Sequence, residues 1–124
     1  MKIKVTDVEK INAALEDVQN RCSARTVDAA DVAKICERVE ERLGISKRAM
    51  DGITVVADCH AQQFPSAYRY TPESTHVYLM YRRGAWYMTD ARRESCWSPT
   101  VGVRVNLTDA AREAIVQRCV TFGM

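Results

Sequence analysis

Apolar residues recur every three or four positions along the first third of the chain, which predicts two consecutive amphipathic helices. The first apolar stripe consists of Val8, Ile11, Leu15, Val18 and Cys22, on a helix expected to end near residue 21. The second follows the N-cap candidate Asp28 and consists of Val32, Ile35, Cys36, Val39 and Leu43. Gly44 supplies a left-handed stop, and residues 46–50 add a brief helical turn. The helical part therefore spans about residues 7–50.

From residue 53 the apolar period changes to two, which predicts strands over 53–59, 77–82, 85–90 and 101–107, with a short strand over 2–5. Arg83-Gly84 between the middle two strands indicates a β-hairpin. A two-residue loop pairs Tyr81 with Trp86 and Leu79 with Met88 on one side of the ribbon. A three-residue loop shifts that pairing, and the pattern alone leaves both registers open.

Residues 108–120 have a helical stripe again, which predicts a closing helix after a β-rich part over about 53–107. Helices, then strands, then a helix give one α+β domain over residues 1–124. We expect an antiparallel sheet of four to five strands, packed with two N-terminal amphipathic helices and a C-terminal helix. Both faces of the hairpin carry large side chains, and the helices can cover only one of them. The other face is therefore expected to hold a ligand or a partner subunit, which favours a homo-oligomer.

The composition is that of an ordinary globular protein: 124 residues, 47% hydrophobic and 27% charged, with a net charge of +2. That small charge does not indicate a nucleic-acid coat or a membrane-surface protein. No run approaches the roughly 18 apolar residues of a membrane span, and residues 1–10 lack the apolar region of a signal peptide. The five cysteines, an odd number without Cys-x-x-Cys, are expected to be reduced thiols. We therefore expect a cytoplasmic protein.

Nearly all aromatic residues fall within residues 64–97, interleaved with five arginines. Aromatic faces stack on planar rings, and guanidinium groups bind phosphate through two hydrogen bonds, so this mixture suits a ligand with both a base and a phosphate. Many of the candidate residues fall in two irregular segments, 60–75 and 91–100, where recognition residues usually lie. The candidate binding residues are Tyr68, Arg69, Tyr70, Trp86, Arg92, Arg93 and Trp97.

The aromatic residues and Arg25 can each also be explained without a binding function. Tyrosine and tryptophan are common in strands, so half of these rings are equally explained as core. Arg25, in the connection between the two helices, is the candidate for a second anion site, but a solvated loop arginine is the commoner identity.

No motif for catalysis, a metal or a cofactor accompanies the candidate site. Cys59 and His60 are strand neighbours that point to opposite faces, and His76 has no partner at ligand spacing, so no metal site is expected. Residues suited to nucleophilic or acid–base catalysis are present, but no spacing brings them together. A convergent site formed by Asp58, Glu73, Asp90 and His76 is the main alternative to a protein without catalytic residues.

Several stretches resemble the first family of phage-encoded anti-Thoeris sponges, and the likeness extends over the whole chain. They are Met1-Lys-Ile-Lys-Val-Thr6, Ser23-Ala-Arg-Thr-Val27, Leu43-Gly-Ile-Ser-Lys47, Phe64-Pro-Ser-Ala-Tyr-Arg-Tyr70 and Trp86-Tyr-Met-Thr-Asp90. The resemblance implies an oligomeric, non-enzymatic protein that captures cyclic ADP-ribose isomers made by TIR-domain enzymes, and so inhibits bacterial anti-phage defence. Some members also take cyclic oligonucleotides at a separate site.

Two other functions fit the same residues. A small nucleic-acid-binding module would stack single-stranded bases on an aromatic sheet face. A structural or partner-binding protein would use that face as an oligomer interface. The sequence leaves these alternatives open.

Overall fold

The computed structural model describes residues 1–19, 27–59, 73–95 and 102–122. Within them the chain forms a five-stranded antiparallel sheet and four helices, which confirms the expected α+β class. The elements in chain order are β1 (Ile3–Lys4), α1 (Val8–Val18), α2 (Ala29–Leu43), α3 (Lys47–Met50), β2 (Thr54–Asp58), β3 (Glu73–Arg82), β4 (Ala85–Ser95), β5 (Gly102–Asn106) and α4 (Asp109–Phe122).

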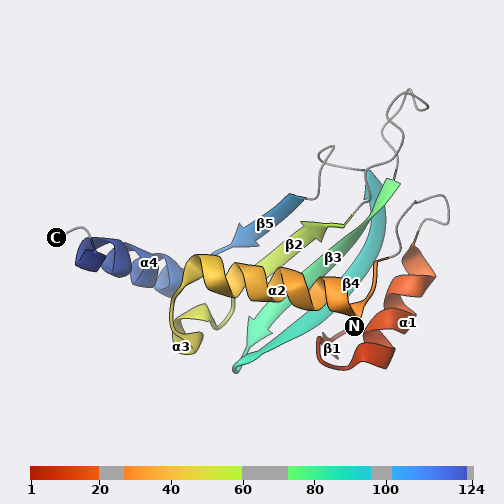
Figure 1. Cartoon of the computed structure of the whole chain (residues 1–124), viewed down its shortest axis with the longest axis horizontal. Helices are drawn as coiled ribbons and strands as arrows, with labels where there is room; N and C mark the ends of the chain where they lie inside the picture. The colour runs from red at the N-terminus through yellow and green to blue at the C-terminus, as the bar shows by residue number, and fades with distance from the viewer. Residues whose placement is uncertain (20–26, 60–72, 96–101, 123–124) are drawn as a thin grey trace.

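The strand order is β1-β4-β3-β2-β5, and every neighbouring pair is antiparallel. Helices α1 and α2 lie against one face of the sheet, where α1 contacts both β4 and α2 (Figure 1). Helices α3 and α4 contact each other near the C-terminal end of α2. No helix of the described residues covers the opposite face, which we call the open face.

The limits of α2 follow the expected capping chemistry. The Asp28 carboxylate accepts a hydrogen bond from the Asp31 backbone N–H at 3.0 Å, and the Asp31 carboxylate accepts one from the Asp28 N–H at 3.1 Å. Two of the four N–H groups that lack an intrahelical partner at the start of the helix are thereby satisfied. At the other end Gly44 adopts φ 57°, the left-handed conformation that terminates the helix.

Helix α1 ends at Val18, before the expected end near residue 21. Gln19 is extended, and its side-chain amide binds the Val27 backbone twice: it donates to the carbonyl at 2.9 Å and accepts from the N–H at 2.7 Å. These bonds tie the end of α1 to the start of α2. The rest of the connection, including Arg25, lies outside the described residues. The closing helix reaches Phe122, slightly beyond the expected end.

The β3–β4 hairpin has the two-residue loop Arg83-Gly84, with φ 49° at Arg83 and φ 79° at Gly84. Positive φ at both loop residues is the pattern of a type I′ turn, whose twist matches that of the flanking strands. Tyr81 therefore pairs with Trp86, which resolves the register in favour of the two-residue alternative. Farther along, the register shifts by one residue, because Tyr78 pairs with Asp90 while Leu79 pairs with Met88.

This register sorts the side chains onto the two faces of the sheet. Five of the side chains that face the helices are at most 1% exposed and form the centre of the core: Val55, Val77, Leu79, Tyr81 and Met88. The residues on the open face are mostly polar or aromatic, among them Asp58, His76, Tyr78, Tyr87, Arg92 and Arg104. Among the described helices, none has the length and apolar character needed to cross a membrane.

We expect Arg83→Asn to raise the free energy of unfolding by about 0.5–1 kcal/mol, because asparagine tolerates the left-handed conformation better than arginine does. Chemical denaturation measures the change. Arg82→Asn is the matched control, since Arg82 has an ordinary strand conformation one residue earlier and gains nothing. Destabilisation by Arg83→Asn would contradict the turn assignment.

Candidate functional site

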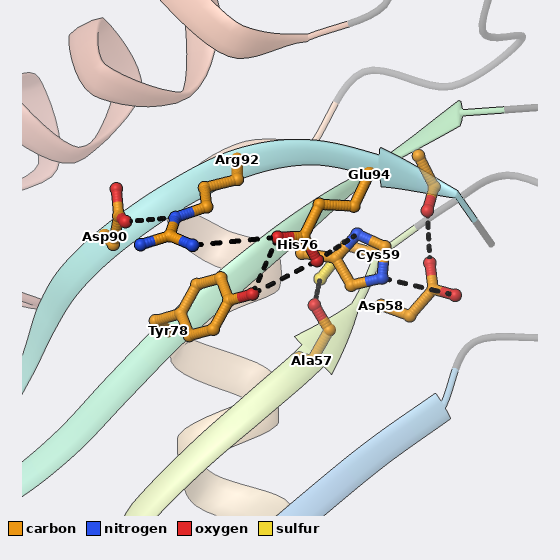
Figure 2. A network of polar contacts seen from close by, with 9 residues as sticks. Ala57, Asp58, Cys59, His76, Tyr78, Asp90, Arg92 and Glu94 are labelled. Atoms are coloured by element: carbon orange, nitrogen blue, oxygen red, sulfur yellow. Dashed lines mark hydrogen bonds and ion pairs between the residues drawn. The ribbon is translucent and has the colours of Figure 1, made fainter. Parts of the chain in front are cut away.

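A cluster of polar side chains lies on the open face, at the end of the sheet where β2 and β4 finish and β3 and β5 begin (Figure 2). Register pairs His76 of β3 with Asp58 of β2 on one side and with Arg92 of β4 on the other. The chain that connects β2 to β3 and β4 to β5, where the two irregular segments were predicted, starts and finishes at this end of the sheet. The predicted segments 60–75 and 91–100 were too long, because β3 begins at Glu73 and β4 continues to Ser95, which places Arg92 and Arg93 on a strand. The cluster therefore lies on the strand ends that lead into and out of those segments along the chain.

The inner half of the cluster is fully buried. The Ser74 hydroxyl donates a hydrogen bond to Asp58 Oδ1 at 2.7 Å, and both residues have no exposed surface. His76 is equally buried and lies between two carboxylates: its Nε2 is 3.8 Å from Asp58 Oδ2, and its Nδ1 is 4.0 Å from Glu94 Oε2. Buried polar groups of this kind are retained when they have partners, because an unpaired one is costly.

The outer half of the cluster reaches solvent. The Tyr78 hydroxyl lies 2.9 Å and 3.1 Å from the two Glu94 oxygens, to which it donates its hydrogen bond. Arg92 forms an ion pair with Asp90, approaches Glu94 at 3.9 Å, and places its guanidinium carbon 5.2 Å from the centre of the Tyr78 ring. The Arg92 side chain is still 60% exposed, so part of its hydrogen-bonding edge remains open to an anion.

The electrostatics of the outer half follow from these contacts. Partial burial raises the pKa of Tyr78, and the hydrogen bond to Glu94 raises it further, so the phenol stays protonated and donates. The hydrogen bond from Arg92 lowers the pKa of Asp90. The pKa of Arg92 is raised by the same bond, and the guanidinium is therefore a permanent cation. Glu94 therefore accepts the hydrogen bond of the Tyr78 phenol and lies 3.9 Å from the Arg92 guanidinium.

The cluster lacks the arrangement of an activated nucleophile among the described residues. The Ser74 hydroxyl donates to the Asp58 carboxylate, whereas nucleophilic catalysis needs the hydroxyl to donate to a base such as an imidazole. Cys59 is 7% exposed and directs its thiol toward the Ala57 carbonyl at 3.8 Å. The described residues also contain no group of three or more side chains placed to hold a metal ion.

Arg92 and Arg93 were both predicted to contact the ligand, and as strand neighbours they point to opposite faces of the sheet. Arg92 pairs with His76 on the open face, whereas Arg93 pairs with Thr75, on the same side of β3 as Val77. One phosphate therefore cannot contact the Arg92 and Arg93 side chains at the same time. Both side chains are exposed, so each remains a separate candidate for an anion.

Trp86 was expected to stack a base, but its ring packs in the core. It is 8% exposed, meets Tyr81 edge-to-face at a ring distance of 5.1 Å, and donates its indole N–H to Glu40 of α2 at 2.9 Å. The register explains this placement, because the Tyr81–Trp86 pair faces the helices. The alternative explanation of the aromatic rings as core residues therefore applies to Trp86. We do not include Trp86 in the candidate site.

The other predicted site residues lie outside the described part of the chain: Arg25, Tyr68, Arg69, Tyr70 and Trp97. Conversely, sequence reasoning did not assign Ser74 or Glu94 to a site, and it counted Tyr78 only among the aromatic residues. Asp58, Asp90 and His76 were recognised by type but not placed together. Cross-strand pairing of β2, β3 and β4 brings these residues together, and this pairing can be used for prediction only once the register is known.

Comparisons of the chain with protein-family models, with curated proteins and with solved structures found no match. The site must therefore be interpreted from its own chemistry.

We expect Ser74→Ala to lower the free energy of unfolding by about 1–3 kcal/mol, because it removes the 2.7 Å hydrogen bond to the fully buried Asp58. Denaturant titration is the measurement. Asn106→Ala serves as the control, since its 3.3 Å bond to Thr54 is exposed and its loss should cost less than about 0.5 kcal/mol. Equal, negligible losses for both variants would contradict a structural role for the buried half.

Proposed function

We propose that this protein binds a cyclic nucleotide-type immune signal on its open face and holds it without converting it. The ligand class follows from the resemblance to the first anti-Thoeris sponge family: a cyclic ADP-ribose isomer, with a cyclic oligonucleotide as a further ligand. Holding the signal would inhibit bacterial anti-phage defence from the cytoplasm of the host cell. The proposal includes a homo-oligomer and needs no metal or cofactor.

The observation that supports this proposal is the Arg92–Tyr78–Glu94 group at the solvent-exposed edge of the cluster. Cyclic ADP-ribose isomers carry a pyrophosphate and ribose hydroxyls. The open edge of Arg92 would donate to a phosphate oxygen. Glu94, which is 34% exposed, would accept from a ribose hydroxyl. An anion bound only by Arg92 would compete with Asp90 and Glu94 for the guanidinium, so a ligand with both phosphate and hydroxyl groups fits better than free phosphate.

The proposal that the ligand is bound but not converted rests on the geometry of the cluster. Hydrolysis of a glycosidic or phosphodiester bond needs a positioned acid–base pair, a nucleophile with its base, or a metal. In the described cluster the carboxylates of Asp58 and Glu94 instead serve as hydrogen-bond acceptors for Ser74 and Tyr78. Of these groups, Glu94 is 34% exposed and would orient a ligand, whereas Asp58 and Ser74 are fully buried and support the cluster from within.

A second candidate function, single-stranded nucleic-acid binding, is favoured by one feature of the open face. Tyr87 of β4 lies on the open face, next to β3. The Lys2 ammonium is 4.9 Å from the centre of the Tyr87 ring. Rings and cations along a sheet face are the means by which small modules stack bases and neutralise phosphates.

A binding panel separates the two functions. Calorimetry with cyclic ADP-ribose isomers, linear ADP-ribose, a cyclic trinucleotide and an oligothymidylate identifies the ligand class. Binding of an extended strand weakens by about one log unit per log of salt for each phosphate contacted, whereas a ligand with two phosphates gives a shallow slope. Selective binding of the oligonucleotide with a steep slope would replace sequestration by the second function.

We expect Arg92→Ala to lower the affinity for the cyclic ADP-ribose isomer about ten- to hundredfold, the effect of losing one charge-assisted hydrogen bond. Arg82→Ala is the matched control, because Arg82 is also an exposed arginine on the open face but lies at the hairpin end of the sheet. Melting temperatures of both variants verify folding. Unchanged affinity for Arg92→Ala would place the site elsewhere on the molecule.

A further inference from the structure

Strand β5 forms one edge of the sheet, and no strand among the described residues pairs with its outer side (Figure 1). The N–H and C=O groups along such an edge can pair with another extended chain. At the opposite edge the two-residue strand β1 covers part of β4, which is a common way to protect a sheet edge. Strand β5 is longer, with five residues, and its Val103 is 44% exposed. The β5 edge is therefore open to a further strand.

The register shows which backbone groups of β5 point outward. Directly after β2, the Cys59 N–H donates to the backbone of β3 at 2.8 Å. Bonding alternates between the two sides of a strand, so odd-numbered residues of β2 bond toward β3 and even-numbered ones toward β5. Arg104 pairs with the even-numbered Val56 and bonds inward. Its neighbours Val103 and Val105 therefore direct both N–H and C=O away from the sheet.

The side chains of the same two valines line a groove between β5 and α2. The groove has a volume of about 510 Å³, and its apolar wall on α2 is formed by Ile35, Val39 and Leu43. Val103 and Val105 face this side because they pair with helix-facing residues of β2. A strand added to β5 would place every second side chain on the same side, next to the two valines. The open edge and the apolar groove therefore suit one kind of ligand, an extended chain.

The charged residues around this edge are mostly basic. Arg38 and Arg42 line the groove together with Glu41. Arg104 lies on the open face, between the two valines in sequence. All four of these charged residues are exposed. An acidic residue opposite Arg104 on an added strand would form a favourable cross-strand pair, whereas a basic residue there would be repelled.

We propose that the β5 edge binds an extended segment of another protein by strand addition, and that this segment has an acidic residue between two apolar ones. The segment runs antiparallel to β5, as neighbouring strands do throughout the sheet. Its two apolar residues pair with Val103 and Val105, exchange N–H and C=O hydrogen bonds with them, and direct their side chains toward the groove. Its acidic residue lies on the open face, opposite Arg104.

A second copy of β5 fits this edge less well than such a segment. If both valines of one copy pair with both valines of the other, Val103 lies opposite Val105. That register places Arg104 directly opposite its own copy. Like charges directly opposite each other destabilise a strand pair. The charge pattern therefore favours a partner with a different sequence.

Backbone methylation of a peptide tests strand addition to the full-length protein. The probes are fluorescein-labelled peptides with the sequence Ser-Thr-Val-Glu-Val-Thr-Ser, and counterparts with isoleucine, leucine or phenylalanine in place of both valines. Fluorescence anisotropy measures their affinity. In the tightest-binding peptide, methylation of the first apolar residue's nitrogen removes an N–H that faces β5 and should weaken binding at least about tenfold. Methylation of the glutamate nitrogen removes an N–H that points away, and should change the affinity less than about threefold.

Val103→Pro tests the same contact from the protein side. Proline removes an N–H that points outward, so the ladder with β2 is kept while peptide affinity should fall at least about tenfold. Val103→Thr is the matched control, because it keeps both the N–H and a β-branched side chain. Circular dichroism verifies folding, and Val105→Pro, which removes the second outward N–H, gives the same test if Val103→Pro unfolds.

Arg104→Glu tests the charge preference. The wild type should bind the peptide with glutamate at the middle position at least about threefold more tightly than one with lysine there, and Arg104→Glu should reverse this order. Failure of all four peptides to bind, equal effects of the two methylations, unchanged affinity in the folded proline variant, or an unchanged charge preference would each overturn the proposal. A wild-type oligomer that dissociates in Val103→Pro would also overturn it, because a second copy would then occupy the β5 edge.

Discussion

The two-residue turn of the β3–β4 hairpin fixes the rest of the structure, because it sets which side chains of the two longest strands face the helices. With positive φ at Arg83 and Gly84, Tyr81 and Trp86 face α2, and Leu79 and Met88 join the core. A shift of the pairing by one residue would turn the side chains of one strand to the other face relative to its partner. With β3 unchanged, Tyr87 would then face the helices, and Trp86 and Met88 would face outward. The one-residue shift between Tyr78 and Leu79 then brings Arg92 into line with His76 and thereby completes the polar cluster.

The periodicity of the sequence was sufficient to predict the elements of the fold. The helical stripes, the cap at Asp28 and the stop at Gly44 are local signals in the sequence. The structure has the cap and the stop of α2 at these two residues. The end of α1 was missed, since the Gln19 amide that binds Val27 is a contact between residues eight positions apart. The bulge in β4 was missed for a similar reason, because nothing local marks one extra residue in a strand.

The candidate site was harder to predict because its residues come from three strands. Composition identified an arginine-rich aromatic region but could not separate core rings from surface rings, so Trp86 was assigned to binding when it packs against Glu40. Both adjacent arginines were counted as candidates for one site, although strand alternation directs Arg92 and Arg93 to opposite faces of the sheet. The buried Asp58–His76–Glu94 alignment depends on register across β2, β3 and β4, which no single stretch of sequence encodes.

The central claim is capture without conversion, and the fate of the ligand tests it most directly. The protein is saturated with a cyclic ADP-ribose isomer, incubated for hours and denatured by heat, and the released material is separated by chromatography. We predict that the isomer is recovered intact and in stoichiometric amount. A product peak that grows with time, and that disappears in a folded His76→Asn variant, would show that the buried cluster performs chemistry and would contradict the account.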